Sequence, residues 1–449
     1  MRFWNNKITI FLSGALLICS FFSSLSANQN SQGMNLTEAL EIALKQNPEI
    51  RSVRAQRKAT EAKVRKSQSD YFPQVALSSG YTRYEEPTVI IPIHEIGVFP
   101  PLDNDLFYAV SQVKWPLFNG GRTVAAIRAA KASANESVAL EDLTEMQLIE
   151  RITQIYIQSQ ELQDKEALII ARLNVLQQSY HELSILLQEG RVSPADLALV
   201  TSSLELTRAD KLEIESTSNQ LAIRLGQLLG TNSPIQPLIF MKNDFNEDNV
   251  LQDTPEIASE ITGPQVRKSQ ARLDQAEALH SQASRSFWPK INGTANYFLH
   301  SGGNLDIFGE WAVGVNINLP IFDGGRRTAN VRAAEASMKA AEEALKSAQQ
   351  AQNASLKIAL EQWRLSNLRQ AHLAEAVESK SLSIEAQRRL YEAGRSSLIE
   401  LLTQETELMK LQMDERSAAY VGLLAVLFYH ASAGSLTPNL AESIVRSML

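Results

Sequence analysis

The stretch Pro116-Leu117-Phe118-Asn119-Gly120-Gly121-Arg122 is followed, 204 residues further along the chain, by Pro320-Ile321-Phe322-Asp323-Gly324-Gly325-Arg326. The same offset relates three more pairs of segments: Arg128-Ala129-Ala130 and Arg332-Ala333-Ala334, Gly190-Arg191 and Gly394-Arg395, and Gly230 and Gly434. Several matches in one register indicate an internal repeat. We therefore expect two structurally equivalent halves that contain the same series of elements.

Each half contains a long run without glycine or proline, which predicts one very long helix. These runs are residues 122–189 and 326–393, and each would form a helix of about 100 Å at 1.5 Å per residue. The apolar residues of the first run that fall at alternating spacings of three and four include Leu148, Ile152, Ile155, Leu162, Leu173, Leu176, Tyr180, Leu183 and Leu187. Such spacing is typical of a coiled coil.

Shorter helices are expected to cover the long helices end to end. In each half the chain turns at Gly190 or Gly394 and returns as a second helix, while an opening helix starts at Pro48 or Pro264. Proline suits the first turn of a helix. Neither short helix covers a long one alone, so two stack along it. The result is a rod with strands at one end and Gly-Arg turns at the other.

Four segments alternate between apolar and small or polar residues, which predicts strands at about 74–84, 106–117, 290–299 and 310–319. In the last segment one face carries Trp311, Val313, Val315, Ile317 and Leu319. Strands of roughly ten residues with this pattern occur in outer-membrane barrels. A half-buried sheet in a soluble domain fits the same alternation. Since four strands cannot close a barrel, a membrane location requires several copies in a ring.

The N-terminus has the pattern of a secretory signal peptide. Residues 1–27 comprise a charged region with Arg2 and Lys7, an apolar core and a stretch of small residues. The single cysteine, Cys19, lies inside this segment, and Ile18 before it is not the small residue that a lipoprotein site needs. Removal of the peptide would leave a mature chain without cysteine, and therefore without disulfide or thiol chemistry.

Composition excludes several classes of function. The 449 residues carry a net charge of -7 with mixed signs, so nucleic acid is not an expected partner. The six histidines are scattered without the spacing of a zinc site, and Asn-Gly-Gly-Arg lacks the Lys-Ser/Thr of a phosphate loop. We find no catalytic constellation and expect no enzyme activity, cofactor or metal, so an energy source would come from a partner.

The repeat and two turn motifs together resemble the TolC family of outer-membrane efflux channels. The motifs are Glu-Gly-Arg-Val-Ser-Pro-Ala-Asp-Leu at 189–197 and Ala-Gly-Arg-Ser-Ser-Leu-Ile-Glu-Leu at 393–401. The resemblance covers about 34–434. It implies a mixed α and β membrane protein, mostly long α-helical coiled coils. Three chains would share a 12-stranded β-barrel in the outer membrane and a helical barrel across the periplasm.

The resemblance also gives an expected division of the chain. After the signal peptide, residues 34–230 form the first efflux repeat, 231–256 a linker, 257–434 the second repeat, and 435–449 a C-terminal tail. The linker and the tail, together with the segment near 34–47, would form an equatorial belt around the helices.

The repeated stretch predicts a sharp junction between strand and helix. Asn119 and Asp323 suit helix N-caps, because their side chains accept hydrogen bonds from free amides. The pairs Gly120-Gly121 and Gly324-Gly325 allow the backbone to turn abruptly. This junction is expected to be purely architectural.

The turn motifs predict caps at the start of the returning helices. Ser193 and Ser397 can cap them, and Asp196 and Glu400 are favoured near those N-termini by the helix dipole. The resemblance adds that this end is the periplasmic tip, where the pore is gated and an adaptor docks. It implies a gate of Asp196, Glu400, Tyr391 and Arg395. The implied docking residues are Gly190, Arg191, Ser193, Leu197, Gly394, Ser397 and Leu401.

In the implied gate, Tyr391 would bond Asp196 across neighbouring hairpins. The chain departs from the family pattern at two positions. The gating arginine of the family falls on Ser396, one residue after Arg395, and the second acidic position beyond Glu400 is Thr403.

These observations favour a passive outer-membrane exit duct of a tripartite efflux pump or type I secretion system. Its partners would be two further copies of the chain, an adaptor, an inner-membrane pump and outer-membrane lipid. A soluble periplasmic coiled-coil scaffold or adaptor protein is the alternative. An enzyme with a coiled-coil stalk is disfavoured because the sequence contains no catalytic constellation. The sequence does not name the cargo.

Overall fold

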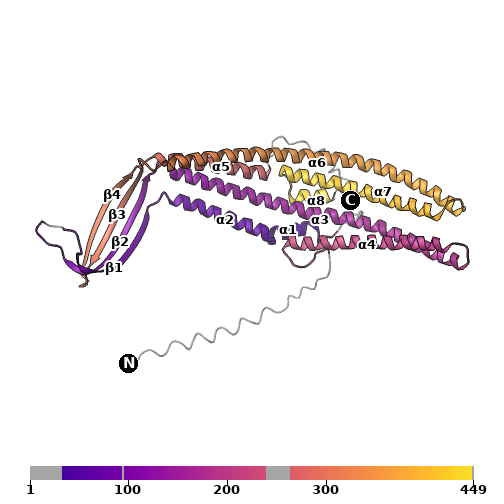
Figure 1. Ribbon diagram of the computed structural model, residues 1–449, viewed down its shortest axis with the longest axis horizontal. Coiled ribbons are helices and arrows are strands. Elements are labelled where there is room, and N and C mark those ends of the chain that lie inside the picture. Colours follow the sequence, from indigo (N-terminus) through magenta and orange to yellow (C-terminus); the bar gives the residue numbers. More distant parts are fainter. Residues whose placement is uncertain (1–32, 94–95, 239–262, 447–449) are drawn as a thin grey trace, which may run out of the picture.

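The computed structural model describes residues 33–93, 96–238 and 263–446. The expected signal peptide and most of the expected linker lie outside these residues. The described chain is an elongated rod of helices with a single sheet at one end (Figure 1).

The two halves contain the same elements in the same order, as the repeat predicts. In the first half α2 (Pro48–Ser69) leads into β1 (Gln74–Val89), β2 (Leu102–Phe118), α3 (Arg122–Gln188) and α4 (Pro194–Leu229). In the second half α5 (Pro264–Ser284) and the short 3-10 helix η1 (Arg285–Phe287) lead into β3 (Lys290–Ser301), β4 (Ile307–Asn318), α6 (Arg326–Glu392) and α7 (Leu398–Ala433). The two long helices have 67 residues each.

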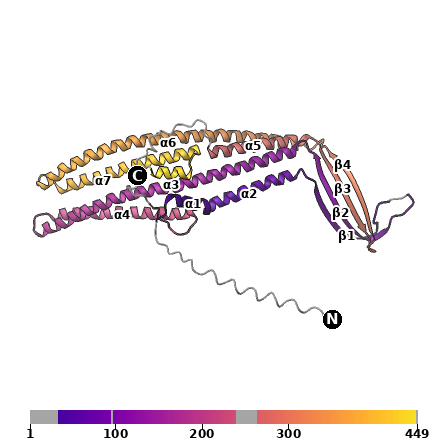
Figure 2. The ribbon, with the colours of Figure 1, turned by 180° about the vertical axis from the view of Figure 1, so that it is seen from behind.

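The short helices stack end to end along the long ones, as expected from their lengths. Helices α2 and α4 lie along α3, and α5 and α7 lie along α6 (Figure 2). The halves meet where α3 packs against α5 and α7. The order across the rod is therefore α2 with α4, then α3, then α5 with α7, and finally α6.

The four strands form one antiparallel sheet in the order β1-β2-β3-β4. All four expected strands are present, but β1 and β2 are longer than predicted. Their pairing continues past a register shift between Arg83 and Thr88, where the sequence no longer alternates cleanly. Strands β1 and β4 are edges without a partner inside the described chain.

The two faces of the sheet differ in chemistry. The strand register pairs Lys114 with Gln74 and Thr294, and Thr294 with Gly314, so these four residues lie on the same face. The other face carries Trp311, Val313, Val315 and Ile317, all largely exposed in the single chain. A sheet that presents its large apolar side chains to the outside lacks the core of a soluble domain.

The apolar core lies near the middle of the rod, where α1 (Leu36–Gln46) and α8 (Pro438–Arg446) pack against α3. Leu36, Leu40 and Leu427 are among its fully buried side chains. Residue 34 forms a bridge to Pro237 in the described part of the linker. That these segments form an equatorial belt stays a prediction.

Within the described residues, none of the helices combines the length and the apolar character needed to cross a membrane.

Candidate functional site at the junctions and the hairpin tips

Each junction between strand and helix turns at a pair of glycines with positive φ. The φ angles are 66° at Gly120 and 79° at Gly121, and 67° and 83° at Gly324 and Gly325. L residues with a side chain rarely adopt this left-handed conformation. The prediction that the glycines form the turn is confirmed.

The N-cap assignment at the junctions requires a correction. The N-caps are Gly121 and Gly325, two residues after Asn119 and Asp323. Because two left-handed residues intervene, helical geometry starts later than predicted. The side chains still reach the first turn: the amide of Thr123 donates to Asn119 Oδ1 at 3.4 Å, and the amide of Arg327 donates to Asp323 Oδ2 at 3.2 Å.

The first junction packs closely against η1. A Cβ atom on Gly120 would lie 2.4 Å from Cβ of Trp288, and one on Gly121 would lie 2.3 Å from Nη1 of Arg285. That nitrogen donates a hydrogen bond to the carbonyl of Gly121 at 2.9 Å. The junction therefore fixes the sheet relative to the helices, which agrees with an architectural role.

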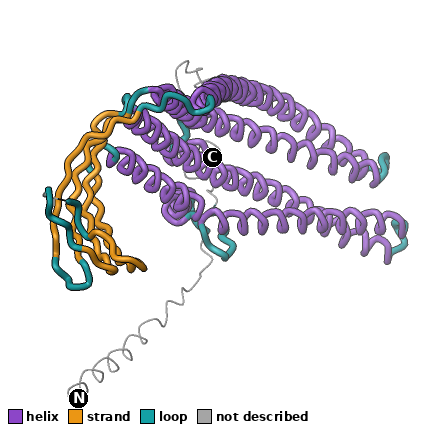
Figure 3. The backbone as a smooth tube through the Cα atoms, turned by 60° about the vertical axis from the view of Figure 1, so that its left-hand side comes forward, coloured by secondary structure: helices purple, strands orange, loops and turns teal. Residues whose placement is uncertain are grey.

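The two hairpin tips lie at the end of the rod opposite the sheet (Figure 3). In the first tip, Gly190 has φ 70° and Ser193 is the N-cap of α4. Ser193 Oγ accepts from the amide of Asp196, and the Asp196 carboxylate accepts from the Ser193 amide at 3.1 Å. This capping box confirms the predicted cap and occupies the Asp196 carboxylate within its own hairpin.

The second tip holds its carboxylate differently. Ser397 is the N-cap of α7 and accepts from the amide of Glu400, as predicted. The Glu400 carboxylate accepts from Ser396 Oγ at 2.8 Å and from Gln387 Nε2 at 3.3 Å. Because Gln387 also donates to Ser396 Oγ, the two side chains together tie Glu400 to the end of α6.

Tyr391 contributes to contact between the two hairpins. Its ring packs against an apolar cluster that includes Leu176 and Val200 of the first hairpin and Leu402 of the second. The expected hydrogen bond from Tyr391 to Asp196 is not formed in the described chain. Burial, and then the nearby Asp196 charge, raise the pKa of the Tyr391 phenol, which therefore stays neutral.

The predicted docking residues divide into exposed and buried groups. Arg191, Arg395, Ser193 and Ser397 are exposed, and Leu197 is half-buried. Leu401 is only 7% exposed, so its side chain stabilises the hairpin and is not available to a partner.

An ion cluster around a buried pair ties the two hairpins together, and sequence reasoning missed it. Arg172 of α3 and Glu405 of α7 form an ion pair, with side chains that are 8% and 10% exposed. Arg388 of α6 donates to the other Glu405 oxygen at 2.9 Å. Arg172 also contacts the carbonyl of Leu402 at 3.4 Å. We call Arg172, Glu405 and Arg388 the clasp.

A second set of polar contacts joins α3 and α7 nearer the middle of the rod. Tyr420 donates to the Asp164 carboxylate at 2.8 Å, and Arg416 donates to the same oxygen at 3.0 Å. Burial and this carboxylate raise the pKa of Tyr420. A charged residue on an otherwise apolar seam is the only sequence signal for such pairs, because the partners are remote in the chain.

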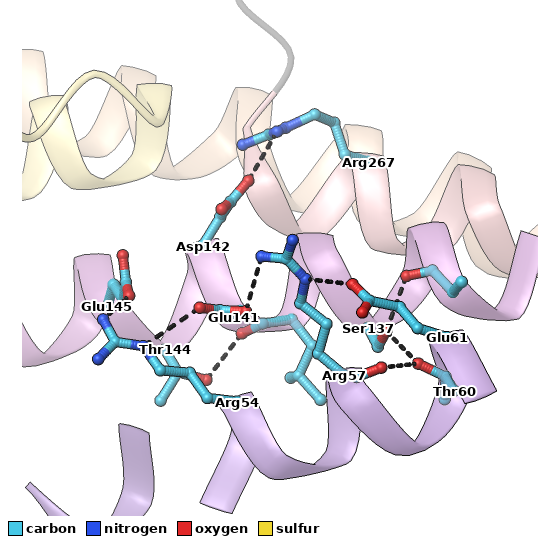
Figure 4. A network of polar contacts seen from close by, with 12 residues as sticks. Arg54, Arg57, Thr60, Glu61, Ser137, Glu141, Asp142, Thr144, Glu145 and Arg267 are labelled. Carbon is cyan, nitrogen blue, oxygen red and sulfur yellow. Dashed lines mark hydrogen bonds and ion pairs between the residues drawn. The ribbon is translucent and has the colours of Figure 1, made fainter. Parts of the chain in front are cut away.

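The half of the rod nearer the sheet is tied together on both sides of α3 (Figure 4). Arg54 of α2 donates to Glu141 at 3.2 Å and to Glu145 at 2.6 Å. Arg267 of α5 donates to Asp142 at 2.9 Å from the other side. Hydrogen bonding to Glu145 is the main cause that raises the pKa of Arg54. These contacts stabilise this half against relative movement of the helices.

Among residues 33–93, 96–238 and 263–446, no group of three or more histidine, cysteine or acidic side chains is placed to hold a metal ion.

Comparisons with known proteins agree with this architecture. The family model "Outer membrane efflux protein" matches residues 39–231 and 260–423. Protein CyaE of Bordetella pertussis is 23% identical over 412 residues, which cover 89% of this chain and 84% of that protein. The toluene efflux pump outer membrane protein TtgF of Pseudomonas putida is 25% identical over 313 residues, or 66% of this chain and 61% of that protein.

The crystal structure of the outer membrane protein VceC from Vibrio cholerae shares the fold. It superposes with a TM-score of 0.78 at 17% identity, covering 89% of this chain and 96% of that one. The family model covers most of both repeats, which is well over half of the chain. The chain therefore belongs to the outer membrane efflux protein family.

Proposed function

We propose that the protein is a passive outer-membrane exit duct of an efflux pump or secretion system, built from three copies of the chain and opened at the hairpin tips by a periplasmic adaptor. The adaptor in turn would link the duct to an inner-membrane pump. The observation that carries this proposal is that both the helical part and the sheet of the single chain have two outer edges without a packing or pairing partner.

The helical part has two edges that lack a partner. Helix α6 buries four side chains, whereas α3, of equal length, buries twenty. The exposed large apolar residues of α6 include Ile358, Leu365, Leu368 and Leu382, and those of α4 at the opposite edge include Leu206, Leu212 and Ile223. Helix α6 of one copy can therefore pack against α4 of the next.

The sheet has matching edges. Strand β4 ends one side and β1 the other, so β4 of one copy can pair with β1 of the next. In lipid an open edge leaves backbone groups unpaired at a cost of several kcal/mol each. Three copies supply twelve strands and close the barrel, with the Trp311–Ile317 face toward lipid and the face of Gln74 and Lys114 toward the lumen.

The tips supply exposed groups that fit docking of an adaptor. The Arg191 guanidinium pairs with the exposed Glu189 of its own turn, at 3.5 Å, and Arg395 is exposed. A Cβ atom on Gly190 or Gly394 would meet nothing within 4 Å, so the turns are open to a partner. An adaptor that binds the separated hairpins more tightly than the closed ones would open the duct.

The test combines assembly with conduction. Native mass spectrometry of the detergent-solubilised protein should show three copies, and planar bilayers should show discrete channel currents. A stable monomer with intact sheet signal, soluble without detergent and silent in bilayers, would instead identify a periplasmic scaffold.

A further inference from the structure

The strand-to-helix junction of the first repeat borders a polar cavity of about 450 Å³. It lies between the ends of β2 and β3 nearest the helices, the first turn of α3 and the end of α5. Its lining includes the cations Lys114, Arg122 and Lys290 and a single carboxylate, Asp70.

The two lysines lie on the small, polar face of the sheet. Lys114 is opposite Gln74 and Thr294, and Lys290 is opposite Asn318. This face is the reverse of the one with Trp311 and Val313. In the trimer that we propose above, on which this inference rests, the cavity faces the lumen where the strands meet the helices.

The positive charge at the cavity is only partly offset by the protein. Across residues 33–93, 96–238 and 263–446, the side chains of Lys114, Arg122 and Lys290 form no ion pair. Asp70 offsets one of these three charges. The first turn of α3 has no acidic residue, so the positive end of its dipole adds to the field.

The other junction of each chain keeps the arginine, as Arg326, but lacks the two lysines. At the repeat offset of 204 residues Lys114 becomes Asn318, and alignment of Pro73 with Pro289 makes Gln74 the counterpart of Lys290. The two lysines are therefore not required by the turn itself, because the chain forms the same turn at the second junction without them.

We infer that the cavity binds oxyanion groups of solutes in the lumen and that its copies form a basic collar favouring anions at the base of the barrel. Lysine and arginine donate charge-assisted hydrogen bonds to phosphate and carboxylate oxygens. Fixed charge of one sign in a narrow, low-dielectric passage concentrates ions of the opposite sign. Anionic cargo would thus be favoured at this level of the duct.

The test uses the full-length protein in bilayers of phosphatidylcholine, which has no net charge. The reversal potential in a KCl gradient gives the chloride-to-potassium permeability ratio. We expect Lys114→Gln with Lys290→Gln to lower this ratio several-fold. Lys45→Gln, which removes one exposed positive charge from α1, should leave it unchanged. Inorganic phosphate should reduce the wild-type current, and the double variant should need about tenfold more phosphate for the same reduction.

Three results would overturn the inference. An unchanged permeability ratio at normal conductance would refute the collar and leave the duct intact. A change seen only when anionic phosphatidylglycerol is added would place the cavity against lipid headgroups. Absence of any wild-type current would refute both the collar and the proposed duct. If the double variant does not assemble, the single variant Lys290→Gln provides the same test with a smaller expected effect.

Discussion

Replacement of Glu405 by alanine should open the duct at rest. Glu405 lies at the centre of the clasp, where it accepts hydrogen bonds from Arg172 of the first hairpin and from Arg388 of its own hairpin. Alanine leaves the Arg172 guanidinium buried between α3 and α7 without its counter-ion. The charge regains water only if the two hairpins separate, so the substitution favours the open arrangement.

The size of the effect follows from burial. An exposed ion pair contributes about 0.2–1 kcal/mol, whereas removal of one partner of a buried pair costs about 3–5 kcal/mol. With side chains only 8% and 10% exposed, the pair of Arg172 and Glu405 belongs to the buried class. A penalty of this size shifts a two-state equilibrium by roughly two to four orders of magnitude for each chain.

The assay is single-channel recording in planar bilayers, with the open probability as the readout. Glu407→Ala is the matched control, because Glu407 lies two residues away on α7 but pairs with Lys380 inside the same hairpin. We expect a large increase for Glu405→Ala and wild-type behaviour for Glu407→Ala. Native mass spectrometry must show that both variants assemble. An assembled Glu405→Ala variant with wild-type open probability, or equal increases in both variants, would refute the clasp as the closing contact.

Three further predictions concern the membrane face, the tips and the middle of the rod. Val315→Arg should prevent trimer assembly, because a charge near the bilayer midplane costs about 2–4 kcal/mol per site. Asn316→Arg, on the lumen face, should still assemble. Equal yields of trimer for the two variants on native gels would exclude a lipid-facing sheet. Arg191→Glu with Arg395→Glu should leave the trimer intact but abolish export, since the docking surface changes sign; normal export in a transport assay would exclude the arginines from docking. Burial lowers the pKa of His430 in the folded protein from its ordinary 6.5. As pH falls, the unfolded chain therefore binds a proton at this histidine at a higher pH than the folded chain does. The contribution of His430 to stability is complete above pH 6.5 and is lost as pH falls below it. Thermal unfolding should therefore show less loss of stability between about pH 7.5 and 5 in His430→Gln than in wild type, and identical losses would contradict the assignment.

The amino-acid sequence by itself determined the elements and their order. Helix, strand and turn signals are local: the runs without glycine or proline give α3 and α6, the glycine pairs give the junctions, and Ser193 and Ser397 give the caps. Because of the internal repeat, each of these signals occurs twice in the chain. Local signals gave strands β1 and β2 that were too short, because pairing between the strands extends them further. They also placed the helix N-caps two residues too early, because two left-handed glycines come before each long helix.

Only the tertiary structure decided which side chains meet. Arg172 and Glu405 are separated by 233 residues, and Arg172 lies on a helix of 67 residues, so no spacing rule relates them. The same holds for Leu401, which the turn motif presents as a docking residue and which packing buries, and for the cations at the junction cavity. Periodicity shows which face of a helix or strand is apolar, but the partner of that face depends on how α3, α6 and α7 pack in space.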